Sequence, residues 1–474
     1  MRGTRLTIAT LLVASAVAVA IAVSRLDYFS APPPNVLLIT FDTTRADRLG
    51  CYGHADGISP RIDALAAQGV VFDNAYTTAS VTPVSHASIL TGQNPYTHGL
   101  RVLHGLSDNV LPESATTLAE MLKAADYRTA AFISGFPAGR RFGLQQGFDT
   151  FDESFLDKPI DQIVEPSGAV NTGKSQRRAD ATTDGALKWL AETPERFFAW
   201  VHYFDPHDAK TVPPPEFLQQ FEPESGTPEA EMWAQALTST ESRKWMLNRV
   251  YDIEIQYMDQ QLGRVFDALE ADGRWQDTIV IVVSDHGQGL GDHNWWTHGI
   301  LYQEQIKAAF IVRVPGIAGG RRVKHVVRGI DIVPTVLDLV GLGKAITPIE
   351  GESLVPMLRA EAADPGYVAY ADSVNILTYA SEARMYDQKL DMLFAIVDDR
   401  WKYIHHALRQ DESELYDLQQ DPRELTNLYA KGGADLERLR QNLRARPYQP
   451  KRGAVRNQLS DEDRERLRAL GYLE

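Results

Sequence analysis

Two nearly continuous apolar runs limit the folds that this chain can adopt. Residues 36–41 and 278–284 are apolar or β-branched at almost every position, and each run ends at a polar residue. A strand with one solvated face alternates apolar and polar side chains, whereas a strand covered on both faces does not alternate. Both runs therefore predict central strands of a sheet that is packed between two layers of helices.

Strand-like and helical segments alternate along most of the chain. Further strands are expected at residues 70–72, 128–133, 197–203 and 310–314, and helices at 61–69, 116–124, 242–271 and 332–340. This alternation predicts an α/β fold with a mostly parallel central sheet flanked by helices. After Gly341, short strands at 368–370, 392–397 and 401–404 predict a smaller, antiparallel α+β subdomain.

These patterns divide the chain into four segments. Residues 1–34 form a hydrophobic anchor or signal with a Pro-rich spacer, and residues 35–341 form the main α/β domain. Residues 342–430 form the smaller subdomain, and residues 431–474 form a charged helical tail. A chain of 474 residues is long enough for a large core and a smaller companion.

The N-terminal segment carries the clearest signal of location. Arg2 and Arg5 precede an uncharged run from residue 6 to residue 23, and Arg25 closes it. A helix of that length would measure roughly 27 Å, enough to cross the apolar core of a bilayer. The full run favours one uncleaved transmembrane helix, although its alanine-rich end also permits a cleaved signal peptide. Either interpretation places the rest of the chain outside the cytoplasm, in the periplasm or at the cell exterior.

The charge and cysteine content exclude several classes of partner and site. The formal net charge of −15 argues against general binding to nucleic acid, which requires a basic surface to displace counterions. It does not exclude an anionic substrate, because a bound metal ion can reverse the local field. The single cysteine, Cys51, excludes an internal disulfide and a metal site built from several cysteines.

Polar groups gather where the predicted strands end. Asp42 follows the strand at 36–41, and Asp285 and His286 follow the strand at 278–284. A third segment, residues 82–88, supplies the hydroxyl of Thr82. Ligands of open α/β sheets bind beyond the carboxyl ends of the strands. Two carboxylates, an imidazole and a hydroxyl at that edge fit the ligand set of a divalent cation.

Each of these features also has an ordinary structural interpretation. An aspartate at a strand end commonly forms a turn, and a threonine beside a proline commonly starts a helix. The combination favours chemistry, because a cation at such a site would lower the pKa of the hydroxyl and make it a useful nucleophile.

The chain resembles the sulfatases of the alkaline phosphatase superfamily over residues 35–430. An ordered set of motifs carries this resemblance, and no single motif is sufficient. The motifs are Asn35 to Asp42, Ser59 to Ala66, His86 to Gly92, Ser284 to Gly287, Leu290 to His293, His298-Gly299, Pro315-Gly316, Gly351 to Leu354, Trp401 to Tyr403, Glu414 to Leu418 and Asp421-Pro422. The resemblance implies an alkaline phosphatase-like fold and the hydrolysis of sulfate esters.

The resemblance also implies a metal site. Asp42, Thr82, Asp285 and His286 would hold one divalent ion, which could be Ca, Mn, Mg or Zn. Thr82 stands where most sulfatases carry a cysteine or serine that is oxidised to formylglycine. A threonine cannot undergo that conversion, so no formylglycine is expected. Thr82 itself becomes the expected nucleophile.

Three histidines complete the expected catalytic site. The resemblance gives His207 a contact with substrate, and it places His298 beside the transferred group and the leaving oxygen. His86 stands in place of the arginine that the family carries there. A narrower alternative places a second metal ion between Asp205, His207 and His298.

Three hypotheses for the function remain open. The resemblance implies a sulfuric ester hydrolase. Thr82 and the predicted anchor favour a phosphodiesterase, or a transferase of the phosphoethanolamine or phosphoglycerol type, that acts on lipids or glycans of the cell envelope. The third hypothesis is a catalytically silent, sulfatase-like binding protein, and the intact ligand set argues against it.

Overall fold

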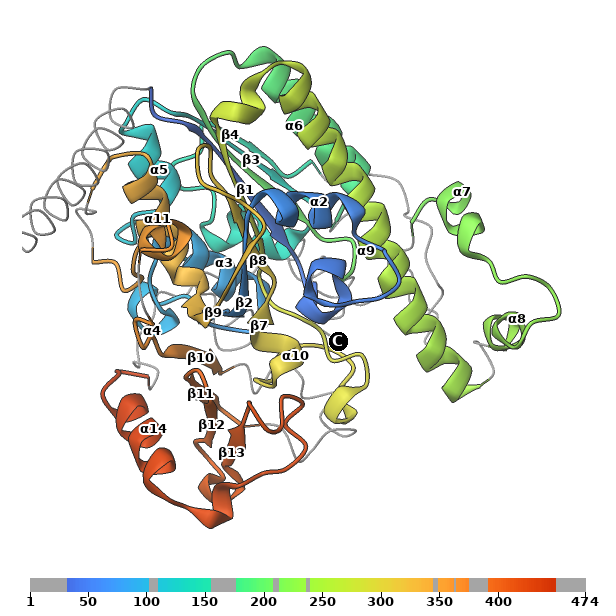
Figure 1. The fold of residues 1–474 in the computed structure, drawn as a ribbon, viewed down its shortest axis with the longest axis vertical. Helices are drawn as coiled ribbons and strands as arrows, with labels where there is room; N and C mark the ends of the chain where they lie inside the picture. The colour runs from blue at the N-terminus through green and yellow to red at the C-terminus, as the bar shows by residue number, and fades with distance from the viewer. Residues whose placement is uncertain are drawn as a thin grey trace, which may run out of the picture.

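A nine-stranded sheet with helices on both faces forms the centre of the molecule in the computed structural model (Figure 1). The structure describes residues 32–101, 110–154, 176–207, 213–235, 239–343, 348–361, 364–374 and 391–448. The strands follow the order β4-β3-β5-β1-β6-β8-β2-β7, and β9 pairs with β2. Their bounds are β1 (Asn35–Phe41), β2 (Val70–Tyr76), β3 (Arg128–Ile133), β4 (Thr150–Asp152), β5 (Phe197–Tyr203), β6 (Thr278–Ser284), β7 (Lys307–Ala308), β8 (Phe310–Arg313) and β9 (Arg321–Arg328).

The part of the sheet from β4 to β6 is parallel, as the alternation of strands and helices predicts. β8, however, runs antiparallel to both β6 and β2, so the whole sheet is mixed. The chain leaves β6 and enters β8 at the same edge, where the Ser284 N–H donates to the Ala309 carbonyl at 2.9 Å. A parallel crossover usually requires a long helix. The connection from β6 to β8 contains a 3-10 turn at Asp292–Asn294, the short α10 (Gln303–Ile306) and the two-residue β7, but no long helix, and β8 returns antiparallel.

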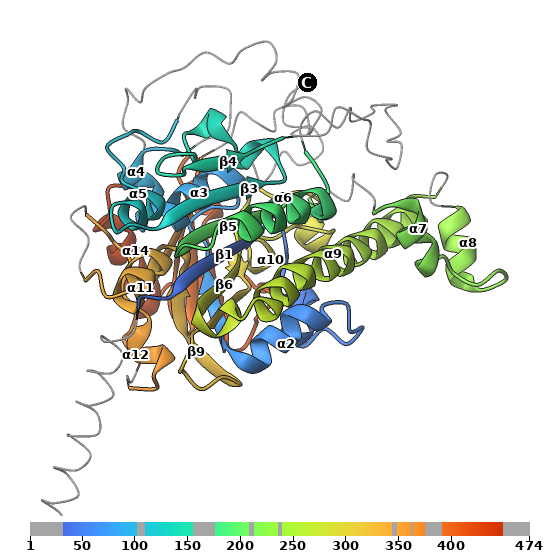
Figure 2. The same cartoon turned by 90° about the horizontal axis from the view of Figure 1, so that it is seen from above.

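Strand β1 shows why the central runs are apolar throughout. Val36 and Leu38 pack into one core cluster, and Leu37 and Ile39 pack into the cluster on the opposite face. Helices α3 (Thr82–Thr91), α5 (Leu118–Lys123), α11 (Ile332–Leu339) and α12 (Val355–Leu358) cover the first face. Helices α2 (Pro60–Gln68), α6 (Ala179–Glu192) and α9 (Thr240–Ala271) cover the second face, as Figure 2 shows from above. The short α4 (Pro95–His98) follows α3.

A second, four-stranded antiparallel sheet forms the C-terminal subdomain, as predicted. Its strands are β10 (Ala369–Ser373), β11 (Leu393–Val397), β12 (Trp401–His406) and β13 (Glu414–Asp417). One face of this sheet packs against the α/β domain, and helix α14 (Ala434–Arg444) covers the other face through Leu436, Leu439 and Leu443. The helix predicted near residues 460–469 lies outside the described residues.

Two short helices, α7 (Pro215–Leu218) and α8 (Pro228–Ala234), form an arm near the start of α9 that projects from the body (Figure 2). The membrane-spanning segment expected at residues 6–23 lies outside the described residues. Among the helices that the structure does describe, none has the length and apolarity needed to cross a bilayer.

Candidate active site

Three neighbouring strands carry the predicted polar residues to one edge of the sheet. In the register of the sheet, Phe41 at the end of β1 lies between Ser284 of β6 and Tyr203 of β5. The Asp42 N–H donates to the Tyr203 carbonyl at 2.8 Å, and the Asp285 N–H donates to the Phe41 carbonyl at 3.0 Å. The ladder therefore continues one residue past each strand, and it holds the two aspartates side by side.

Asp42, Asp285 and His286 form a compact group of candidate metal ligands. One ligand atom from each residue lies within 4.8 Å of the other two, and all three side chains are fully buried. Asp285 Oδ1 accepts hydrogen bonds from the backbone N–H of Thr43 at 3.1 Å and of His286 at 2.6 Å. Its second oxygen, Oδ2, is buried and accepts no hydrogen bond from the described residues.

The electrostatics of this group fit a divalent cation. Burial raises the pKa of Asp285 well above its usual value, and the nearby negative charge of Asp42 raises it further. Two buried carboxylates side by side are unfavourable unless a positive charge lies between them. The uncompensated Asp285 Oδ2 and the set of two carboxylates and one imidazole therefore suit a bound cation.

Thr82 is the first residue of α3, and its side chain faces the ligand group. Its Oγ1 lies 3.4 Å from His286 Nε2. Helix α3 begins here with proline in its first turn, and Val81 before it gives no side-chain cap. The first N–H groups of a helix lack partners within it and favour anions. Thr82 thus acts as both a helix start and a member of the site, so both interpretations of the sequence describe the same residue.

His86 lies one turn after Thr82 on α3, and its side chain holds the first turn of this helix in place. Its Nδ1–H donates to the Thr82 carbonyl at 2.8 Å, and its Nε2 accepts from the Thr40 hydroxyl at 3.0 Å. Thr40 in turn accepts from the Trp200 indole N–H at 2.9 Å. Burial lowers the pKa of His86 well below its usual value, so the neutral form required by this bonding is the stable one. Both ring nitrogens are used in holding the start of α3.

His202 is a residue of the candidate site to which the sequence analysis gave no role. It precedes the last residue of β5, and its Nε2 lies 3.2 Å from Asp42 Oδ2. Burial lowers its pKa to about 3, and the neutral ring donates Nε2–H to the carboxylate. The signal was present as a second histidine five residues before His207. Only the pairing of β5 with β1 shows that it meets Asp42.

His207 and His298 join the same cluster of rings. The His207 ring stacks on Phe204 at 4.2 Å between centroids, and its centroid lies 5.4 Å from that of His298. The His298 and His286 centroids are 4.7 Å apart. His298 Nδ1 lies 2.9 Å from the Ser80 carbonyl, which orients the ring. The structure therefore brings the predicted histidines to the site where Thr82 lies.

The alternative of a second metal ion held by Asp205, His207 and His298 is not supported. Among the described residues, these three side chains do not form a candidate metal-binding group. Asp205 instead accepts a hydrogen bond from the Ala179 N–H at 2.9 Å, at the start of α6. Burial raises the pKa of Asp205 to about 7. This carboxylate caps a helix, because the chain enters α6 directly beside the end of β5.

Comparisons with known proteins agree with this geometry. A profile of the sulfatase family matches residues 34–342, more than half of the chain. The chain belongs to the sulfatase family. A second profile, described as N-sulphoglucosamine sulphohydrolase, C-terminal, matches residues 291–450 of this sulfatase. An arylsulfatase of Clostridium perfringens is 27% identical, and the alignment covers 83% of this chain and 90% of that protein.

Solved structures show the same fold. A protein in complex with its substrate D-glucosamine-2-N,6-O-disulfate matches this sulfatase with a TM-score of 0.70 at 22% identity, covering 87% of this chain and 97% of the other. A phosphonate monoester hydrolase of Agrobacterium radiobacter matches with a TM-score of 0.68 at 23% identity, covering 87% and 94%. This sulfatase is therefore a hydrolase of a family whose members bind a divalent metal ion, and Asp42, Asp285 and His286 are its candidate ligands.

Proposed function

We propose that this sulfatase is a metal-dependent hydrolase of sulfate esters that uses the Thr82 hydroxyl as its nucleophile. The observation that carries the proposal is the position of Thr82 Oγ1, 3.4 Å from His286 Nε2 and beside the buried pair of aspartates. A divalent cation held by Asp42, Asp285 and His286 would neutralise the charge on the sulfate oxygens and lower the pKa of the hydroxyl. Ca, Mn, Mg and Zn are all compatible with two carboxylates and one imidazole.

The reaction has two steps, transfer of the sulfate group to Thr82 and its hydrolysis from Thr82. Thr82 Oγ attacks sulfur as the bond from sulfur to the ester oxygen breaks, and the proton that leaves Thr82 passes to the departing oxygen. The imidazoles of His207 and His298 would carry that proton. Water then attacks the sulfur of the sulfated threonine, which releases sulfate and restores Thr82. The N-terminal end of α3 stabilises the anionic group throughout, and His86 holds that end in place.

Thr82 itself favours a second candidate, the hydrolysis or transfer of phosphate esters. Without an aldehyde, a sulfated threonine has no elimination route and must be hydrolysed at sulfur. A phosphorylated threonine can be attacked again at phosphorus, by water or by an acceptor alcohol. The substrates in this case are phosphodiesters on lipids or glycans of the cell envelope.

We also infer from the sequence that the catalytic domain acts outside the cytoplasm, anchored through residues 6–23. The full chain is then expected in the membrane fraction after alkaline carbonate washing, whereas a chain that begins at residue 32 is released. Recovery of the full chain in the soluble fraction would reject the anchor.

The test of the chemistry compares three aryl substrates, a sulfate, a phosphodiester and a phosphonate. Thr82→Ala is expected to reduce kcat by about a thousandfold or more, because the nucleophile is lost. Thr97→Ala, at an exposed position on α4, is the matched control and retains activity. Mass spectrometry of the trapped wild type is expected to find the transferred group on Thr82.

Each outcome separates the candidates. Preference for the aryl sulfate supports the sulfatase, and preference for the phosphodiester supports the second candidate. Sulfatase activity that survives Thr82→Ala would overturn the threonine mechanism. Purified, active protein that contains no divalent metal by elemental analysis would overturn the metal-dependent part.

A further inference from the structure

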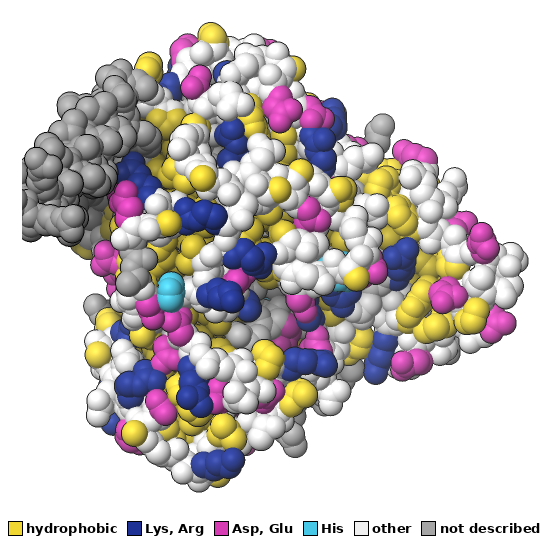
Figure 3. Space-filling model, viewed as in Figure 1, with side chains coloured by type: hydrophobic (Ala, Val, Ile, Leu, Met, Phe, Trp, Pro, Cys, Tyr) yellow, Lys and Arg dark blue, Asp and Glu magenta, His cyan; other side chains and the backbone are white. Residues whose placement is uncertain are grey.

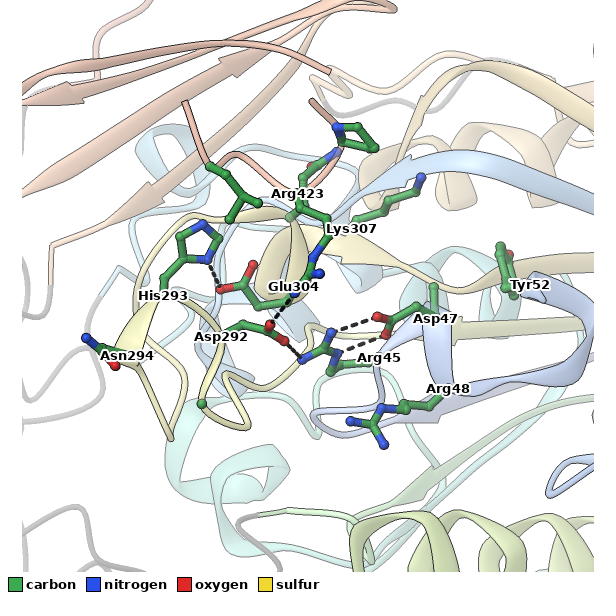
Figure 4. Close-up of a pocket in the computed structure, with 15 residues that line it drawn as sticks. Arg45, Asp47, Arg48, Tyr52, Asp292, His293, Asn294, Glu304, Lys307 and Arg423 are labelled. Carbon is green, nitrogen blue, oxygen red and sulfur yellow. Dashed lines mark hydrogen bonds and ion pairs between the residues drawn. The ribbon is translucent and has the colours of Figure 1, made fainter. Parts of the chain in front are cut away.

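A cleft of about 990 Å³ opens between the α/β domain and the C-terminal subdomain, and none of the predicted site residues lines it (Figure 4). Its walls come from the loop after β1, the loop after β6, the segment around α10 and β7, and a loop that follows β13. Figure 3 shows basic and acidic side chains gathered on this part of the surface. The cleft is therefore a separate, charged feature of the fold.

The acidic side chains of the cleft are already paired. Asp47 and Asp292 both bind the guanidinium of Arg45, at 2.7 and 2.6 Å. Glu304 binds His293 at 2.9 Å. Dashed lines in Figure 4 mark these pairs. These carboxylates are therefore already neutralised by cationic side chains that line the same cleft.

Lys307 differs from the other cations of the cleft. It lies on β7 and lines the cleft, yet its ammonium group forms no hydrogen bond or ion pair with any residue that the structure describes. Asp73, on the adjacent β2, is bound by Arg322. Burial lowers the pKa of Lys307, and the more distant charges of Asp73 and Asp47 only partly offset this. A partly buried ammonium group that lines a cleft and has no counter-ion there can bind an anion.

The balance of charge in the cleft also favours an anionic ligand. Its lining holds four arginine and lysine side chains and three aspartate and glutamate side chains, whereas the whole chain is strongly acidic. Arg423, whose side chain is 74% exposed, lines the cleft from the C-terminal subdomain and touches Asp292 only at 3.4 Å. A small oxyanion would accept hydrogen bonds from Lys307 and lie in the field of Arg423.

We propose that this cleft binds a sulfate or phosphate group, with Lys307 as its principal counter-ion. The group is either a free inorganic anion or a substituent on a larger molecule. This site does not depend on the chemistry at Thr82. It does share loops with that site, since Arg45 follows Asp42 by three residues and Asp292 follows Asp285 by seven.

Calorimetric titration of the full-length protein tests the proposal with two probes, sodium sulfate and a disulfated disaccharide, at constant ionic strength. Lys307→Gln is expected to weaken one binding event about tenfold or more, which is typical of losing a hydrogen bond to a charged group. Lys324→Gln, at an exposed position on β9, which is separated from β7 by β2, is the matched control and binds as the wild type does. Binding at the Thr82 site persists in both variants.

A second variant covers the case in which Lys307→Gln fails to fold. Arg423→Gln changes an exposed side chain and is expected to weaken the same event severalfold. An effect with sulfate alone identifies a free anion as the ligand, and an effect only with the disaccharide identifies a substituent. Identical titrations for the wild type, Lys307→Gln and Arg423→Gln would overturn the proposal.

Discussion

The His202 ring is one hydrogen-bond partner of the Asp42 carboxylate. The carboxylate lies at the end of β1, and the His202 ring on the adjacent β5 approaches its Oδ2 at 3.2 Å. Groups that hydrogen-bond to metal ligands fix the ligand geometry and tune its basicity. His86 has a comparable supporting role for Thr82, through the backbone carbonyl. At the scale of single residues, the site therefore consists of predicted ligands and of supports that hold them.

Replacing His202 by alanine is expected to lower metal affinity about 10- to 100-fold, because Asp42 loses a hydrogen-bond donor. His202→Gln should recover part of the affinity, since its amide can donate to the same carboxylate. The measurement is titration of the metal-free protein with Ca, Mg, Mn and Zn in turn.

His405→Ala, on β12 and away from the site, is the control for the loss of an imidazole. Equal metal affinity in the wild type and in His202→Ala would show that His202 does not position Asp42.

At the scale of elements, the start of helix α2 is capped by a residue of α9. Helix α2 begins after Ser59, whose side chain gives it no cap. Asp259 on α9 supplies the cap instead, because its carboxylate accepts from the Arg61 N–H at 3.0 Å and from the Ile62 N–H at 2.8 Å. The start of one helix is thus satisfied by a residue about 200 positions away in the chain.

Asp259→Ala is expected to lower the free energy of unfolding by about 1–2 kcal/mol, the usual cost of losing a helix cap. Urea titration measures the change. Asp267→Ala on the same helix is the control, because its exposed ion pair with Arg61 contributes little. A loss in Asp259→Ala no larger than that in Asp267→Ala would contradict the capping role.

The buried carboxyl of Asp259 is also expected to make the free energy of unfolding depend on pH. Burial raises its pKa to about 7, although the two backbone N–H groups act in the opposite direction. The folded state then retains this proton at pH values where the unfolded carboxyl, with a pKa of about 3.9, has lost it. Its contribution to stability therefore falls as the pH rises from about 4 to about 7. Asp259→Asn should remove that part of the slope, and an unchanged slope in urea titrations across this range would refute it.

At the scale of the whole molecule, the C-terminal subdomain is joined to the α/β domain by buried polar contacts as well as by an apolar cluster. Lys402 on β12 pairs with Glu424 at 2.8 Å, and both side chains are completely buried. Glu424 also accepts from the Gln303 N–H at 2.7 Å, at the start of α10. One carboxylate thus links the small sheet to the loop that follows the candidate metal ligands Asp285 and His286.

Lys402→Met is expected to lower the free energy of unfolding by about 3–5 kcal/mol, because it leaves Glu424 buried without its cation. Arg400→Met is the matched control, since Arg400 is half exposed and its solvent-screened pair with Asp417 contributes little to stability. Equal stability of the two variants in urea would show that the buried pair of Lys402 and Glu424 does not stabilise the contact between the C-terminal subdomain and the α/β domain.

The local pattern of side chains determined the central strands and the residues at their ends. The bounds of β3, β5 and β6 are those expected from the sequence, because strands covered on both faces must be apolar throughout. Asp42, Asp285 and His286 lie together, as expected, because parallel strands end at one edge. The mature form and location of the N-terminal segment stay predictions of the sequence.

Only the tertiary structure decided which strands are neighbours and what the supporting residues touch. The antiparallel return into β8, the bond from His202 to Asp42 and the cap that Asp259 gives to α2 all join segments far apart in the chain. Such contacts depend on which elements pack together. The periodicity of a single segment reports how far that segment is buried, and it contains no information about the identity of its neighbours.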